Sequence, residues 1–171
     1  IASGELRPHI NAFGGEDRFW MGPEGGQFAI FFAAGDPFDL EHWQTPAVID
    51  TISYQVVSQD ERQVTFQHRA EVENYSETRF SIQIDRVIEL LDREAVSSLI
   101  GEVGPDVSLV AYQSTNTITN QGSNDWATED GLLSIWILGM FRHSPTTTVV
   151  IPYRKGSEEE LGPVVNDAYF G

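Results

Sequence analysis

Residues 63–72 read QVTFQHRAEV. Apolar side chains alternate with polar ones in this stretch, apart from His68, which falls in the apolar row. An alternation of period two predicts a β-strand with one buried face and one solvated face. We expect His68 to be a satisfied core residue, as a single histidine on an apolar face usually is.

The same pattern continues after a predicted turn at residues 74–77. One face of the next strand carries an apolar row from residue 80 to residue 90, which Arg86 interrupts. A buried guanidinium needs a carboxylate or several carbonyls as partners. Arg86 therefore predicts a core ion pair, with the alternative that its fork reaches a hydroxylated or anionic ligand. A turn at residues 60–61 precedes residue 63, and residues 52–56 alternate in the same way.

Further β-strands are predicted on both sides of this central pair. They are an edge strand at 5–10 interrupted by Pro8, a strand at 27–33 buried on both faces, a strand from Val107 to Asn120, a strand at 132–140 between two sheets, and a strand at 146–151. A short helix is expected from Glu94. Eight to ten strands with little helix predict an all-β fold, an antiparallel β-sandwich or barrel, in one domain over residues 1–171.

Composition excludes several classes of function. The 171 residues carry a formal net charge of −16, which disfavours nucleic acid and anionic membranes as partners. No apolar run is long enough for a membrane helix. The absence of cysteine excludes disulfides and thiolate catalysis, and four scattered histidines predict no metal site. No phosphate-binding loop is present, and no cofactor is expected.

Two segments carry the side chains expected to contact a ligand. The glycine-rich stretch 14–27 and the loop at 116–126 combine charged or amide groups with tryptophan. Amides and carboxylates pair with sugar hydroxyls, and an indole stacks on the apolar face of a sugar ring. Structural turns with Asx caps are the alternative for both segments. The predicted contacts are Glu16, Asp17, Arg18 and Trp20 from the first segment, and Asn120, Asn124, Asp125 and Trp126 from the second.

A third loop, residues 38–46, contains His42 and Trp43. We expect Trp43 to close the core beside a solvated His42, because amphipathic rings often cap cores. The alternative is that both rings line a ligand face.

Three motifs carry a resemblance to a known group. They are GGEDRFWMGPEGG at residues 14–26, NYSETRF at 74–80 followed by RVIELL at 86–91, and LSIWILGMF at 133–141. With these motifs the chain resembles uncharacterised bacterial proteins of the galactose mutarotase-like, or aldose 1-epimerase-like, superfamily. The resemblance implies a β-supersandwich and favours a periplasmic or secreted location over a cytoplasmic one. It also implies that the chain is the N-terminal half of a larger domain, completed by a C-terminal fragment or a second chain.

The resemblance leaves catalysis open. Mutarotases use a histidine and a glutamate as acid and base, and neither is identified here. Gln121 and Gly122 follow Asn120 where the histidine is expected, and the glutamate is expected in the C-terminal half of the larger domain. Only Arg18 and Asn120 match sugar-facing positions. The resemblance implies a carbohydrate-binding protein that acts on aldoses or related sugars; the alternative is a non-catalytic carbohydrate-binding or structural domain that pairs with another chain. Replacing Arg18 with alanine should weaken sugar binding and leave the fold intact, unless Arg18 forms a core salt bridge.

Overall fold

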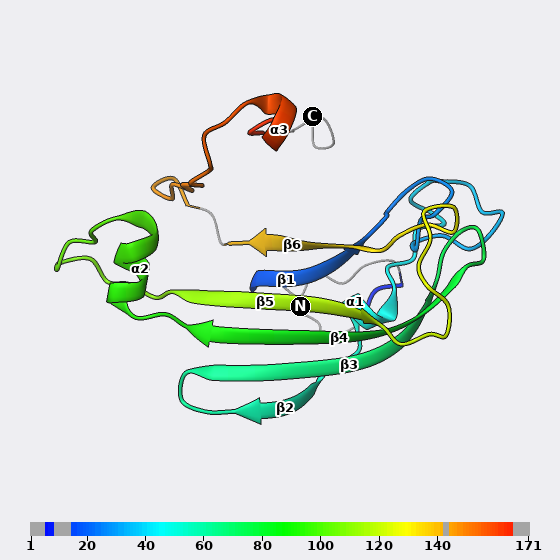
Figure 1. Ribbon diagram of the computed structural model, residues 1–171, viewed down its shortest axis with the longest axis horizontal. Coiled ribbons are helices and arrows are strands. Elements are labelled where there is room, and N and C mark those ends of the chain that lie inside the picture. The colour runs from blue at the N-terminus through cyan, green and yellow to red at the C-terminus, as the bar shows by residue number, and fades with distance from the viewer. Residues whose placement is uncertain (1–5, 9–14, 142–143, 166–171) are drawn as a thin grey trace.

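The computed structural model describes residues 6–8, 15–141 and 144–165, with the backbone alone for Gly15 and Glu16. The described residues form six β-strands and three short helices (Figure 1). A four-stranded antiparallel sheet has the order β2–β3–β4–β5, and β1 pairs with β6 in a two-stranded antiparallel sheet. The fold is an all-β sandwich, as predicted. The strands are β1 (Gly15–Gly22), β2 (Gln55–Gln59), β3 (Gln63–Glu73), β4 (Arg79–Leu90), β5 (Tyr112–Asn120) and β6 (Ser134–Met140).

The central pair is the one that the alternating sequence predicts. β3 and β4 pair without interruption from Gln63 opposite Glu89 to Glu73 opposite Arg79. Their inner face contributes Val72, Phe80, Ile82 and Ile84 to the core, all at most 5% exposed. The turn at residues 74–77 is also confirmed. It is held by Asn74, a buried polar residue that accepts from the Thr78 amide and donates to the Asp130 carbonyl.

Strand β1 is buried on both of its faces. Phe19, Trp20 and Met21 are each at most 3% exposed. Phe19 lies on the side of the four-stranded sheet, where its ring meets the guanidinium of Arg86 at 5.6 Å. Trp20 lies on the opposite side and stacks on Phe31, with ring centroids 5.7 Å apart. This strand is therefore the middle layer of the packed part of the molecule.

The strands predicted at 27–33 and 146–151 are wrong, and so is the position between two sheets predicted for the strand at 132–140. Residues 27–33 form an irregular loop, because Ala29, Ile30 and Phe31 fill the space beside Trp20 without pairing in a sheet. The strand at 132–140 exists as β6, but Ile135, Trp136 and Ile137 are 37–38% exposed and β6 pairs only with β1 in the described sheets. Residues 146–151 are not a strand and are exposed. Residues 6–8 of the predicted edge strand at 5–10 are irregular, and the rest of that segment lies outside the described residues.

Helix α1 (Ala47–Asp50) also covers part of the four-stranded sheet. β2 is only five residues long, so the second half of β3 has no neighbour on that side, and Val48 lies against Ala70 and Val72 there. His68, from the same inner face, is half-buried and stacks on Tyr54 with ring centroids 5.2 Å apart. Trp43 packs against Phe31 and closes the core from the 38–46 loop, as predicted.

The connection between β4 and β5 carries the predicted short helix, α2 (Arg93–Ile100). Asp92 caps its first turn by accepting from the Ala95 amide, and Gly101 ends it with φ 93°. Arg93 then donates three hydrogen bonds to the carbonyls of Val103, Gly104 and Val107. One guanidinium thus organises the irregular chain that returns to β5. A third helix, α3 (Glu158–Leu161), lies near the end of the described chain, and none of the described helices is long and apolar enough to cross a membrane.

Candidate functional site

An open groove of about 710 Å³ lies between the start of β1, the segment that follows α1, and the inner face of the four-stranded sheet. It takes in the contact between Arg86 and Asp17 and the inner-face residues Ile88 and Leu90 at the end of β4. We call it the inter-sheet groove. Its volume lies within the roughly 300–1,000 Å³ range of small-molecule sites. It is lined by Asp17, Arg18, Phe19, Val48, Ile49, Ile52, Ser53, Tyr54, Phe66, Arg86, Ile88, Leu90 and Tyr112.

Two arginine–aspartate pairs lie at the polar end of the groove, although Asp50 itself does not line it. Arg86 donates from Nη2 to Asp17 Oδ1 at 2.9 Å, and both side chains are 13% exposed. Arg18 donates from Nη2 to Asp50 Oδ1 at 2.8 Å, with side chains 9% and 6% exposed. Arg18 also lies over the Trp20 ring at 4.8 Å. Arg86 therefore has the core ion pair that the sequence predicts, and Arg18 is likewise held in a buried one.

The guanidinium of Arg86 retains hydrogen-bonding capacity. Its hydrogen bonds to the described residues, to Asp17 Oδ1 and the Asp17 carbonyl, both use Nη2. Asn116 lies directly opposite Arg86 in the β4–β5 register and on the same face of the sheet. The Asn116 amide donates to Ser114 Oγ, and its buried Oδ1 has no hydrogen-bond partner among the described residues. Arg86 lines the groove, and its Nε and Nη1 donors make no hydrogen bond to a described residue.

Tyr54 also lines the groove, and the pKa of its hydroxyl is perturbed. Burial raises the pKa of its hydroxyl well above the ordinary value, and the positive charge of Arg86 acts in the opposite direction with less effect. Because the hydroxyl stays protonated at neutral pH, Tyr54 can donate and accept hydrogen bonds but is a poor general base.

A second, smaller hollow of about 200 Å³ lies at the other end of the sandwich, between the 120–126 loop and the β3–β4 turn. We call it the loop pocket. Asn120, Asn124, Asp125 and Trp126 all line it. Asn120 is engaged within its own loop, since its amide donates to the Asn124 carbonyl and its Oδ1 accepts from the Gly122 amide. Trp126 is half-buried, with its ring edge-on to Phe80. These contacts are those of an Asx-capped turn.

The structure thus separates the residues that the sequence predicts as one ligand site. Asp17 and Arg18 line the inter-sheet groove, while the four residues of the second segment line the loop pocket. The stacking role expected of Trp20 is wrong for this structure, because the ring is 2% exposed in the core and its Nε1 donates to Glu24. The side chain of Glu16 lies outside the described residues.

The sequence prediction missed most of the groove. Tyr54 and Phe66, and Ile88 to Leu90 with Tyr112, line it without having been singled out. The sequence did contain a signal for these residues, because each belongs to a period-two row of side chains around Arg86. The period-two pattern does not show which of these side chains the second layer of the sandwich leaves uncovered.

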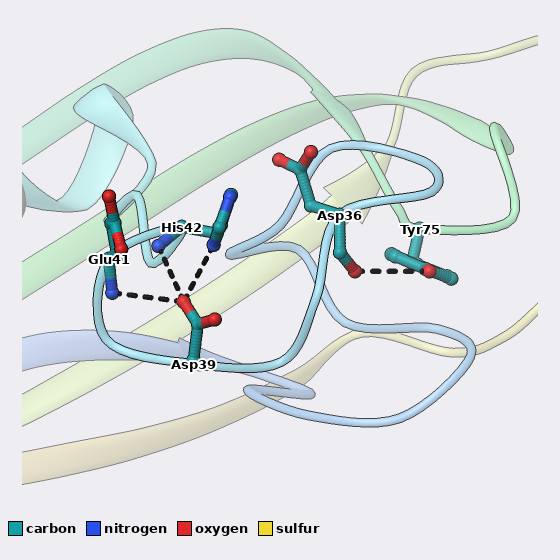
Figure 2. A network of polar contacts seen from close by, with 5 residues as sticks. All are labelled: Asp36, Asp39, Glu41, His42 and Tyr75. Atoms are coloured by element: carbon teal, nitrogen blue, oxygen red, sulfur yellow. Dashed lines mark hydrogen bonds and ion pairs between the residues drawn. The ribbon is translucent and has the colours of Figure 1, made fainter.

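The 38–46 loop carries a separate polar network, drawn in Figure 2. Asp39 Oδ1 accepts from the backbone amides of Glu41 and His42 and lies 2.6 Å from His42 Nδ1. The hydrogen bond to Asp39 raises the pKa of His42, and the same contact lowers the pKa of Asp39. The Tyr75 hydroxyl donates to the Asp36 carbonyl beside it. His42 is thus an exposed, oriented imidazole and lies outside the inter-sheet groove. No group of three or more potential metal ligands is found within the described part of the chain.

Comparison with known proteins places the chain in a single family. A family model described as "Family of unknown function (DUF6786)" matches residues 1–171, and the chain belongs to this family. No curated protein and no solved structure showed significant similarity to the chain.

Proposed function

We propose that this protein binds a carbohydrate in the inter-sheet groove. The observation that carries the proposal is the pair of arginine–aspartate contacts at a groove whose walls include four aromatic rings. Pyranoses have hydroxyls at their rim and an apolar C–H face, so they suit sites that combine charged forks with aromatic rings. The four rings are those of Phe19, Tyr54, Phe66 and Tyr112.

Arg86 is the central ligand contact in this proposal. Its Nε and Nη1 make no hydrogen bond to a described residue, while Nη2 donates to the Asp17 carboxylate and to the Asp17 carbonyl. A sugar hydroxyl can accept from the guanidinium and donate to the carboxylate at once, which neither a cation nor a second carboxylate can do. Arg86 and Asp17 together therefore favour a hydroxylated ligand over a purely ionic one.

A mutarotase-like reaction, the activity that the sequence resemblance implies, is the finer form of this proposal. Such a reaction needs an acid and a base on opposite sides of the anomeric carbon. In the groove, Asp17 is held by Arg86, and the raised pKa of Tyr54 keeps its hydroxyl protonated, as a hydrogen-bond donor and a weak acid. These groups support binding more directly than proton transfer. The mutarotase-like form therefore depends on groups supplied by a second chain or fragment.

The test is a binding panel with a blocked groove. Glucose, galactose, mannose and their uronic acids are titrated against the protein and observed by saturation-transfer NMR and calorimetry. Ser53 lines the groove and is exposed, so Ser53→Trp should fill the groove without disturbing the core. Ser58→Trp, on exposed β2 and outside the groove, is the matched control.

We expect at least one neutral aldose to bind the wild type and the Ser58→Trp variant and to lose binding in Ser53→Trp. The proposal is wrong if no sugar binds at millimolar concentration, or if Ser53→Trp binds as well as the control. Exchange of α and β anomers, followed by NMR with and without protein, tests the mutarotase-like form separately.

A specific observation favours a second function, that of a structural domain covered by another chain. Ile135, Trp136 and Ile137 of β6 and residues 149–151 expose apolar side chains, and β5 and β6 each have one hydrogen-bonded neighbour in the described sheets. Open, apolar strand edges tend to recruit further strands. Sedimentation velocity decides between the two functions, because a stable monomer that binds sugar excludes an obligatory partner.

A further inference from the structure

The inter-sheet groove changes from polar to apolar along β4. Arg86, Ile88 and Leu90 follow one another on the same inner face, since alternate residues of a strand share a face. At roughly 3.3 Å per residue, Leu90 lies about 13 Å beyond Arg86 along the strand. The ion pairs are confined to the Arg86 end of this span.

Neighbouring strands widen the apolar part of the floor. Phe66 lies opposite Arg86 on β3, and Tyr112 lies opposite Leu90 on β5. The facing wall is formed by Val48, Ile49 and Ile52, from α1 and the residues after it. A single pyranose placed against Arg86 would leave the Leu90 end of this groove filled with water against apolar side chains.

The polar end is electrically balanced. Arg86 is matched by Asp17 and Arg18 by Asp50, so the two positive and two negative groups cancel. The whole chain carries −16, and an anionic ligand would meet that field without an excess of positive charge in the groove to offset it. This balance of charge favours a neutral ligand.

From these features we propose that the groove takes a neutral amphiphile: a glycoside whose sugar lies against Arg86 and Asp17 and whose alkyl or aryl aglycone lies over Ile88, Leu90 and Tyr112. This inference rests on the proposed carbohydrate binding and adds the class of sugar derivative. It assigns the apolar half of the groove to specificity for the aglycone. The sugar hydroxyls orient the ligand, and the burial of the tail supplies most of its affinity.

The experiment compares matched ligands that differ in the tail alone. Methyl and octyl β-glucosides and β-galactosides, with octanol as a tail without a sugar, are titrated by calorimetry below their micelle concentrations. A fully buried methylene raises affinity about fourfold, and a half-buried one about twofold. Seven additional methylenes in an open groove should therefore tighten binding by about 100-fold.

A substitution at the apolar end tests whether the higher affinity of the octyl glycosides arises in the groove. Leu90 is 47% exposed, so Leu90→Ser should leave the fold intact and weaken the binding of octyl glycosides at least about threefold more than that of methyl glycosides. Leu99→Ser, at a 69% exposed leucine of α2 outside the groove, is the matched control and should change neither.

Each outcome separates this inference from the proposed function. If octyl and methyl glycosides bind equally, or if Leu90→Ser leaves the octyl advantage intact, the amphiphile inference is wrong and carbohydrate binding stands. If octanol binds as tightly as the octyl glycosides, the sugar makes no contribution and both proposals are overturned. Both are also overturned if none of the probes binds.

Discussion

Replacing Asp17 with asparagine should destabilise the protein by about 2 kcal/mol. The substitution retains the shape of the side chain and an oxygen that can accept from Arg86, and it removes only the negative charge. The guanidinium of Arg86 is then left without a counter-charge at a position that is 13% exposed. An uncompensated buried charge is among the few single changes with a large effect on stability.

The magnitude follows from distance and burial together. Two unit charges about 4 Å apart attract by about 4 kcal/mol at an effective dielectric constant of about 20, and desolvation of both groups offsets part of that attraction. Breaking a fully buried pair costs about 3–5 kcal/mol. The groove admits water to Asp17 and Arg86, and asparagine keeps a neutral hydrogen bond, so about 2 kcal/mol remains.

A second ion pair provides the comparison. Arg79 and Glu73 are closer, at 2.6 Å, but their side chains are 78% and 47% exposed. Because solvent screens exposed pairs, Glu73→Gln should leave the unfolding midpoint essentially unchanged. If burial decides how much each ion pair stabilises the protein, the buried Arg86–Asp17 pair at 2.9 Å contributes more than the exposed Arg79–Glu73 pair at 2.6 Å.

The assay is urea unfolding followed by tryptophan fluorescence, since Trp20 is buried and reports on the core. The free energy of unfolding should fall for Asp17→Asn with an unchanged dependence on urea concentration. The Asp17→Leu, Arg86→Met double variant should recover most of the loss, because it leaves no unpaired charge. A loss no larger than that of Glu73→Gln, or a double variant whose loss equals the sum of two single losses, would refute the reasoning.

Three further predictions concern stability and titration. Arg18→Ala should destabilise by about 3 kcal/mol in urea unfolding, because its aspartate partner is 6% exposed and would lose this buried guanidinium; an intact fold with weaker sugar binding would contradict this. The contact between His42 and Asp39 should contribute fully between pH 3.8 and 6.5, be lost as pH rises through the raised pKa of His42, and be lost as pH falls through the lowered pKa of Asp39. NMR titration of the His42 imidazole in the wild type and in Asp39→Asn checks the upper pH limit, and an unchanged His42 pKa in the variant would contradict it. Gly131→Ala should lower stability by about 2 kcal/mol, because φ is 90° and the added Cβ would lie 2.7 Å from a phenylalanine ring, whereas Gly104→Ala, with open space around it, should be nearly neutral in thermal melts.

Local sequence pattern predicted the sheet but not the way the layers meet. The β3–β4 pair follows from strict alternation, and the interruption at Arg86 correctly predicts a carboxylate partner. The identity of that partner, Asp17, could not be predicted, because 69 residues separate the two and packing alone brings them together. Ala29, Ile30 and Phe31 are buried as predicted, but in a loop, since burial and strand pairing are independent requirements.

The candidate site was only half predictable for the same reason. Asp17 and Arg18 could be singled out because charges beside glycines and tryptophan are unusual in a structural segment. Leu90 and Tyr112 look like ordinary strand residues, and only the extent of β1 leaves them facing a groove. Asn120 was a reasonable ligand contact by chemistry, but its amide is consumed by the loop that it caps.

Arg93 donates three hydrogen bonds to the backbone carbonyls of Val103, Gly104 and Val107, which we call the Arg93 clamp. This clamp affects how the fold can change over evolution. β4 and β5 are adjacent and antiparallel, yet the chain between them makes a long excursion whose return depends on three hydrogen bonds from one side chain (Figure 1). The entropy of closing a loop grows only slowly with its length, so residues inserted between Val107 and Tyr112 would leave the clamp and the strand register in place. Since Tyr112 borders the groove, such insertions would lengthen the wall of the groove without altering the scaffold.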